Sequence, residues 1–150
     1  MTPKFWTAVA LGSTMVVSAP VWANCIPLPV VGGSGTRITK KLSPGGTLVT
    51  GDNWNTDFVV PTDRVFSRFV VTVTPRNQGS YSLNFYLKYP DNSADRFFSR
   101  EPITLEKDRP VRQVGRVRSP KDQPFQVNVF VGGFEAIGNT VQIQVDGCTR

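Results

Sequence analysis

The 150-residue sequence contains no histidine and only two cysteines. Without histidine there can be no Ser-His-Asp triad, no Cys-His dyad and no zinc site with histidine ligands. The formal net charge of +6 also changes little between about pH 5 and pH 8, because no imidazole titrates in that range. The function classes left open are binding, assembly, and catalysis by carboxylates or tyrosine.

Long apolar runs are also scarce, and the one that stands out lies near the start. Residues 5–17 are almost all apolar or small and follow a single charge, Lys4, but the run is shorter than the roughly 20 residues of a membrane-spanning helix. Val21-Trp22-Ala23 then resembles the site that a signal peptidase cleaves. We predict a cleaved signal peptide over residues 1–23 and one domain over residues 24–150, periplasmic or secreted and without a stable membrane anchor.

The two cysteines, Cys25 and Cys148, lie close to the two ends of that domain. An even number of cysteines in an exported chain predicts a disulfide, because the compartments outside the inner membrane are oxidising. A disulfide requires Cα atoms within about 7 Å of each other. The first and last strands are therefore expected to lie side by side or to face each other.

After residue 24 the hydrophobic pattern repeats every second residue rather than every third or fourth. In residues 81–88 the apolar side chains of Tyr81, Leu83, Phe85 and Leu87 alternate with Ser82, Asn84, Tyr86 and Lys88, as in a half-buried strand. Further extended segments are expected at residues 37–42, 47–49, 54–60, 65–74, 96–105, 111–118, 125–131 and 141–148, with Gly115 as a bulge. The pattern predicts an all-β, antiparallel β-sandwich, jelly-roll or Ig-like, of eight or nine short strands with one disulfide.

Three stretches of the sequence resemble a known family. They are Gly-Asp-Asn-Trp-Asn-Thr-Asp-Phe-Val-Val-Pro at residues 51–61, the alternating residues 81–87 before the Asp91-Asn92 turn, and residues 125–131. Over residues 46–147 the chain resembles the bacterial pre-peptidase C-terminal domains. The resemblance implies a small jelly-roll-like module with a targeting or binding role beside a secreted enzyme. Residues 1–150 are expected to include no enzyme domain, so a stand-alone role does not follow from the resemblance.

Arginines and aromatic residues are the candidate ligand contacts. A guanidinium group pairs with carboxylate, sulfate or phosphate, and Trp and Tyr rings can stack on sugars. Arg96 and Arg100 are expected on the strand next to the arginine-rich segment at residues 111–118. The predicted ligand-binding residues are Arg96, Arg100, Arg112, Arg116, Arg118, Trp54 and Tyr86. The alternative is an ordinary solvated sheet face, in which long side chains cover apolar surface or protect an edge strand.

Calcium is the one cofactor that the sequence suggests. Oxygen ligands two residues apart can converge on one cation when a loop curls, although Asp- and Asn-rich loops also form simple turns. The two candidate groups are Asn53, Asn55 and Asp57, and Asp91, Ser93 and Asp95. Neither has the glycine and distal glutamate of an EF-hand.

The chain is therefore predicted to be an exported, non-catalytic binding module for an anionic glycan or another cell-envelope component. Its expected partner is an extracytoplasmic polysaccharide or an envelope protein rather than nucleic acid, because a basic exported protein meets other anions. One alternative is a structural subunit of the cell surface that assembles through strand edges. A second is a polysaccharide-active enzyme that uses tyrosine or paired carboxylates, for which the candidate pairs are Asp52 with Asp57, Asp91 with Asp95, and Glu101 with Glu106.

Overall fold

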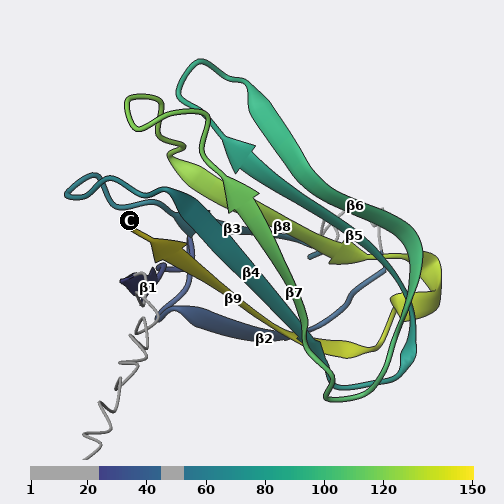
Figure 1. Cartoon of the computed structure of the whole chain (residues 1–150). Coiled ribbons are helices and arrows are strands. Elements are labelled where there is room, and N and C mark those ends of the chain that lie inside the picture. The colour runs from purple at the N-terminus through teal and green to yellow at the C-terminus, as the bar shows by residue number, and fades with distance from the viewer. Residues whose placement is uncertain (1–23, 45–52) are drawn as a thin grey trace, which may run out of the picture.

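A computed structural model describes residues 24–44 and 53–150 and consists of two antiparallel sheets packed against each other (Figure 1). Sheet A contains β1 (Cys25–Pro27), β2 (Arg37–Lys41), β4 (Arg68–Pro75), β7 (Val111–Arg116) and β9 (Thr140–Cys148). Sheet B contains β3 (Asn55–Val59), β5 (Gly79–Lys88), β6 (Ala94–Leu105) and β8 (Gln126–Gly132). A single 3₁₀ turn, η1 (Phe134–Ala136), precedes β9. The predicted antiparallel β-sandwich is confirmed.

Each sheet has a defined strand order, and one segment joins the two sheets. In sheet A, β1 and β2 both pair with β9, which pairs in turn with β4, and β4 pairs with β7. Sheet B has the order β3-β8-β5-β6. Residues 28–36, between β1 and β2, connect the sheets, because Leu28 N donates to Val145 O of sheet A at 2.8 Å while Val30 bridges to Phe58 of sheet B. One side of the sandwich is therefore closed by this segment.

The alternating pattern fills the space between the sheets. In β5, Tyr81, Leu83, Phe85 and Leu87 are fully buried, as the sequence predicts. They meet the inward side chains of the other long strands, which are Phe69, Val71, Val73, Val127, Val129, Val131, Val141, Ile143 and Val145. Each such side chain contributes about 1.5–3 kcal/mol when it is removed from water. The outward residues are left free for contacts with other molecules.

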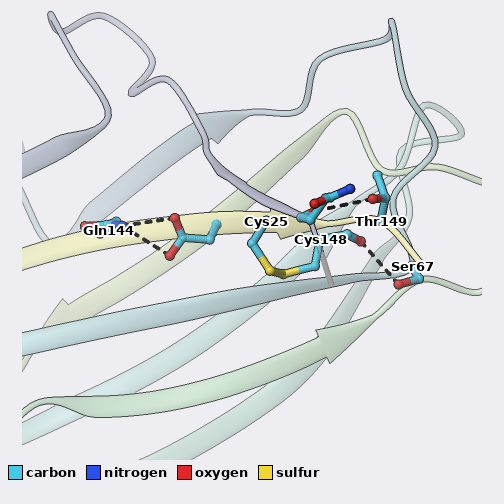
Figure 2. The surroundings of a disulfide bond; sticks show 7 residues. Cys25, Ser67, Gln144, Cys148 and Thr149 are labelled. Carbon is cyan, nitrogen blue, oxygen red and sulfur yellow. Dashed lines mark hydrogen bonds between the residues drawn. A yellow bond between two sulfur atoms is a disulfide. The ribbon is translucent and has the colours of Figure 1, made fainter. Parts of the chain in front are cut away.

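The disulfide lies within sheet A. Cys25 and Cys148 are direct partners in the pairing of β1 with β9, with their Cα atoms 4.0 Å apart, which confirms the predicted bond (Figure 2). Figure 1 shows the C-terminus beside β1. Ser67 donates from its backbone N and its hydroxyl to Cys148 O at 2.8 and 3.2 Å, and Thr149 N donates to Asn24 O at 3.0 Å. Both ends of the domain are thus held against the start of β4.

Two details of the arginine-rich segment differ from the prediction. The strand β7 ends at Arg116, so Arg118 lies beyond it. Gly115 is not a bulge but pairs in register with Phe69. Its missing side chain makes room for Phe97, whose Cδ1 atom would lie 2.8 Å from an added Cβ. Register shifts occur in the pairing of β5 with β6 instead.

Several predictions concern residues outside the described ranges. They are the signal peptide at residues 1–23, the extended segment at residues 47–49 and the carboxylate of Asp52. Within the two described ranges, no helix has the length and apolar character needed to cross a membrane.

Candidate ligand-binding face

Two rows of side chains cross the outer face of sheet B. We call them together the sheet B face. One row runs from β3 through β8 and β5 to β6 and consists of Asp57, Asn128, Tyr86 and Arg96. The adjacent row consists of Asn55, Phe130, Asn84 and Ser99. The face thus combines two aromatic rings, several amides and an arginine.

The aromatic part of this face is held by neighbouring elements. The Trp54 ring lies edge-on to Phe130 and to Phe134, with centroid distances of 5.8 and 6.2 Å. Trp54 Nε1 donates to Ser43 O at 2.6 Å, and the ring lies so close to Gly132 that an added Cβ would be 2.4 Å from Cδ2. The ring is therefore fixed in place. Phe134, by contrast, is 84% exposed.

Tyr86 lies in the row next to Phe130, half-buried, with Asn128 on one side and Arg96 on the other. Diagonal neighbours of this kind have Cα atoms about 7–8 Å apart, within reach of one another's rings. Arg96 is exposed and forms no ion pair with any residue that the structure describes. Of the predicted ligand-binding residues, Trp54, Tyr86 and Arg96 therefore share one side of the molecule.

Asn84 has an unusual environment for an outward-facing residue, because it is only 7% exposed. Its Nδ2 donates to the Glu101 carboxylate, and since an ionised carboxylate only accepts hydrogen bonds, the orientation of the amide is fixed. Its Oδ1 is buried and receives no hydrogen bond from residues 24–44 or 53–150. A buried acceptor without a donor costs about 1–3 kcal/mol, so this oxygen locally destabilises the fold.

The Asp57 carboxylate is at the centre of a small polar network on the same face. Its Oδ1 accepts hydrogen bonds from Lys88 Nζ and Asn128 Nδ2, each at 2.9 Å. The positive charge of Lys88 is therefore matched within the protein. Because Lys88 is paired with Asp57, Arg96 is the cation in the two rows that is available to an external anion.

The first predicted calcium group lies beside this network. Asn53 Oδ1 accepts from Ser43 N at 2.9 Å, so this amide oxygen already has a partner. Lys40 Nζ donates to the backbone oxygen of Asn53 and lies 3.5 Å from that of Asn55. An ammonium group thus contacts two of the three residues that the sequence assigns to calcium.

In the second predicted calcium group, Arg118 lies among the carboxylates. Its guanidinium donates two hydrogen bonds to Asp95, at 2.8 and 2.7 Å, and lies 3.9 Å above the Tyr89 ring. Its Nη1 is 3.8 Å from Asp91 and 3.6 Å from Asp122. The hydrogen bonds from Arg118 lower the pKa of Asp95, and in return Asp95 raises the pKa of Arg118.

The Asp91 loop is also a hydrogen-bonded turn. Ser93 donates from its backbone N and its hydroxyl to Asp91 Oδ1, and these bonds lower the pKa of Asp91. In the described part of the chain, no three or more Asp, Glu, His or Cys side chains are arranged to share a metal ion. Both calcium sites stay predictions.

The remaining predicted arginines lie elsewhere. β6 belongs to sheet B and β7 to sheet A, so the expected pairing of these two strands is not found. Arg112 and Arg116 project from the outer face of sheet A, where they are cross-strand partners of Thr72 and Arg68. Arg100 donates to the backbone oxygen of Ser99, and its guanidinium lies 5.8 Å from the Phe98 ring centroid. The structure therefore divides the predicted basic surface between two sheets.

Phe130 and Asn84 are residues of the sheet B face that were not among the predicted contacts. Phe130 is detectable in the sequence, because it is an aromatic residue in the polar positions of an alternating strand, after Gln126 and Asn128. Nothing in the sequence indicates that Asn84 meets Glu101, since the bulged pairing of β5 with β6 brings them together.

Comparisons with known proteins assign no family. No protein family model matches the sequence, and no curated protein shows significant similarity to it. Two solved structures are similar to the chain. One is the C-terminal family 22 carbohydrate-binding module of Clostridium thermocellum Xyn10B, with a TM-score of 0.39 and 12% identity over 82% of this chain and 85% of that one. The other is the CBM22-1 xylan-binding domain of Paenibacillus barcinonensis Xyn10C, with a TM-score of 0.35 and 6% identity over 78% of this chain and 85% of that one.

Likeness at this level does not assign a function to the chain. The resemblance to pre-peptidase C-terminal domains likewise stays a prediction. The geometry of the sheet B face is therefore the basis for a function.

Proposed function

We propose that the protein is an exported, non-catalytic module that binds an acidic polysaccharide through the sheet B face. The observation that carries the proposal is the combination on one surface of the Tyr86 and Phe130 rings with Arg96, which forms no ion pair with any residue that the structure describes. Each of these groups suits a different part of a charged sugar.

The chemistry of recognition follows from these groups. The C–H face of a sugar ring packs on an aromatic ring, and Tyr86 and Phe130 provide two such rings in adjacent rows. Arg96 can donate two hydrogen bonds to a carboxylate or sulfate on the sugar. Because Trp54 holds Phe130 from the side, the aromatic surface is formed before a ligand arrives.

The carboxylates on this face support a binding role rather than catalysis. Hydrolysis of a glycosidic bond requires two carboxyl groups, one of which must give up a proton to the leaving group. Asp57 accepts hydrogen bonds from Lys88 and Asn128, and Glu101 accepts one from Asn84. Both groups are thus engaged as acceptors within the protein. Export is supported by the predicted signal peptide and by the disulfide.

The test is affinity electrophoresis of the mature, disulfide-bonded protein in gels that contain polygalacturonate, with neutral dextran as the reference polymer. Tyr86→Ala is expected to weaken retention about tenfold, which corresponds to about 1.4 kcal/mol. Arg96→Gln is expected to weaken it severalfold and to reduce its salt dependence, since one charge contact is lost.

The matched control is Arg112→Gln, which removes the same charge from the outer face of sheet A. It should leave retention within about twofold of the unmodified protein. Equal losses in Arg96→Gln and Arg112→Gln would mean that retention reflects the overall positive charge, and would refute a site on sheet B. Circular dichroism must show that all variants are folded.

The same preparation tests the two alternatives from the sequence. Concentration-dependent sedimentation without polysaccharide retention would favour an assembly subunit. Release of reducing or unsaturated sugar ends would favour an enzyme.

A further inference from the structure

A second candidate site lies on the other sheet, at the end that carries the disulfide. A hollow of about 510 Å³ is lined by the start of β4 and the last residues of the loop before it, by the end of β7 and the turn that follows, and by Arg150. This volume is in the range of sites for small ligands. Four arginines line it, Arg68, Arg116, Arg118 and Arg150. No residue of the sheet B face is among its lining residues.

Arg68 and Arg116 are direct partners in the antiparallel pairing of β4 with β7. Like charges in this arrangement destabilise a sheet. In the ranges that the structure covers, neither of them forms an ion pair, and nor does Arg150. Arg118, by comparison, is paired with Asp95. The hollow therefore brings together three guanidinium groups that form no ion pair within the described residues.

The backbone around these arginines is firmly held. Cys148 is the partner of Arg68 on its other side, so the disulfide and the two arginines form one cross-strand row. Ser67 N donates to Cys148 O at 2.8 Å, and Val117 N donates to Ser67 O at 3.3 Å. A site on such a rigid frame needs little reorganisation to bind a ligand.

We propose that this hollow binds a tetrahedral oxyanion, that is, a phosphate or sulfate group, between Arg68 and Arg116 with Arg150 at its rim. A guanidinium fork donates to two oxygens, so several forks match the three or four acceptor oxygens of such a group. A carboxylate offers only two oxygens and one charge.

The other lining residues fit a phosphate or sulfate that is attached to an organic molecule. Ser119 Oγ accepts from Asp122 N at 3.1 Å, which leaves its hydrogen free to donate to the anion. Val65 is 55% exposed and Pro120 lies at the same hollow, so an apolar rim adjoins the guanidinium groups. This site is independent of the proposed polysaccharide face and does not rest on it.

The test is the thermal unfolding midpoint of the disulfide-bonded protein in sodium phosphate, sulfate, acetate and chloride at equal ionic strength, together with calorimetric titration of inorganic phosphate. Phosphate and sulfate are expected to raise the midpoint saturably, because a ligand that binds only the folded state stabilises it. Acetate should act as chloride does. A midpoint no higher in phosphate or sulfate than in chloride would overturn the proposal.

Two variants locate the binding. Arg68→Gln and Arg116→Gln are each expected to weaken phosphate binding at least about tenfold. In chloride, Arg116→Gln should raise the midpoint, because the repulsion from Arg68 is removed; this second result does not depend on ligand. Folded Arg68→Gln and Arg116→Gln variants that bind phosphate as tightly as the unmodified protein would refute the site.

The matched control is Arg37→Gln, an exposed arginine of the same sheet that hydrogen-bonds to Gln144 and does not line the hollow. It should bind phosphate within about twofold of the unmodified protein. Arg116→Gln should leave polysaccharide retention unchanged, and Tyr86→Ala should leave phosphate binding unchanged, so the failure of one proposal does not imply failure of the other.

The phosphate group can belong to a lipid headgroup or to a soluble molecule, and vesicles distinguish the two. Co-sedimentation with phosphatidylcholine vesicles that contain phosphatidic acid, lost in Arg116→Gln, assigns a lipid source. Binding of inorganic phosphate without retention on these vesicles assigns a soluble source.

Discussion

The outer faces of the two sheets differ in whether their charged side chains have partners of opposite charge. On sheet B, Asp57 is bonded to Lys88, and the centre of the face consists of aromatic rings and amides. On sheet A, Arg68 lies opposite Arg116 with no acidic partner in the described part of the chain. The same alternation of polar and apolar residues thus produces one surface suited to sugar rings and another suited to oxyanions.

The largest effect is expected from removal of the disulfide, which lies in the same cross-strand row as Arg68 and Arg116 and should therefore affect sheet A more than sheet B. The double variant Cys25→Ser/Cys148→Ser should lose about 3–5 kcal/mol of unfolding free energy, because the bond closes a loop over a sequence separation of 123 residues. Urea unfolding measures the loss, and the reduced unmodified protein is the control.

In the folded double variant, phosphate binding on sheet A should weaken, while polysaccharide binding on sheet B should be retained. Equal weakening of both would show that the two faces are not independent.

A smaller loss of stability is expected from two glycine-to-alanine substitutions, one in each sheet. A Cβ at Gly132 would lie 2.4 Å from Trp54, and a Cβ at Gly115 would lie 2.8 Å from Phe97. Gly132→Ala and Gly115→Ala are each expected to lower the unfolding free energy by about 1–3 kcal/mol, because a ring must move.

Only Gly132→Ala should also weaken polysaccharide retention, since the displaced Trp54 ring supports Phe130. Thermal unfolding and affinity electrophoresis together check this pair. A loss of retention in Gly115→Ala of the same size would remove the distinction between the sheets.

The smallest effect concerns Arg118, which, unlike Arg116, forms an ion pair with Asp95. Its hydrogen bonds lower the pKa of Asp95 below the ordinary value of 3.8, so this pairing stabilises the folded protein above that pH and is lost as the pH falls through the lowered value. Because the pair is largely exposed, Asp95→Asn should cost less than about 1 kcal/mol at neutral pH.

The difference between Asp95→Asn and the unmodified protein should be smaller at a pH well below 3.8 than at neutral pH, because the carboxylate becomes protonated as the pH falls through its lowered pKa. Urea unfolding at the two pH values measures it. A difference that is the same at both would mean that the charge of Asp95 does not stabilise the fold.

The sequence predicts most of the fold because its local pattern is strong. Alternation in residues 81–88 and 126–131 identifies the inward and outward faces of β5 and β8 correctly, whereas Phe125, predicted on the inward face, lies before β8 and is 45% exposed. The cysteine positions predict that the first and last strands are neighbours, as β1 and β9 are. These features depend on residues close in sequence or on one covalent bond.

The candidate sites depend on contacts that no local pattern encodes. Arg68 meets Arg116 only because β4 and β7 are paired, and Arg118 meets Asp95 of β6 over a sequence separation of 23 residues. The five predicted arginines are close in sequence, yet the chain crosses from sheet B to sheet A between Arg100 and Arg112. Proximity in sequence therefore overestimates how far these charges act together.

The most direct test of a polysaccharide site on sheet B is the chemical-shift map of the ¹⁵N-labelled protein titrated with an acidic oligosaccharide. The amides expected to shift are those of the sheet B face, with Asn84, Tyr86 and Phe130 at the centre and Val70 and Val114 of sheet A unchanged. Perturbations centred on Arg68 and Arg116, or spread evenly over the basic surface, would contradict such a site.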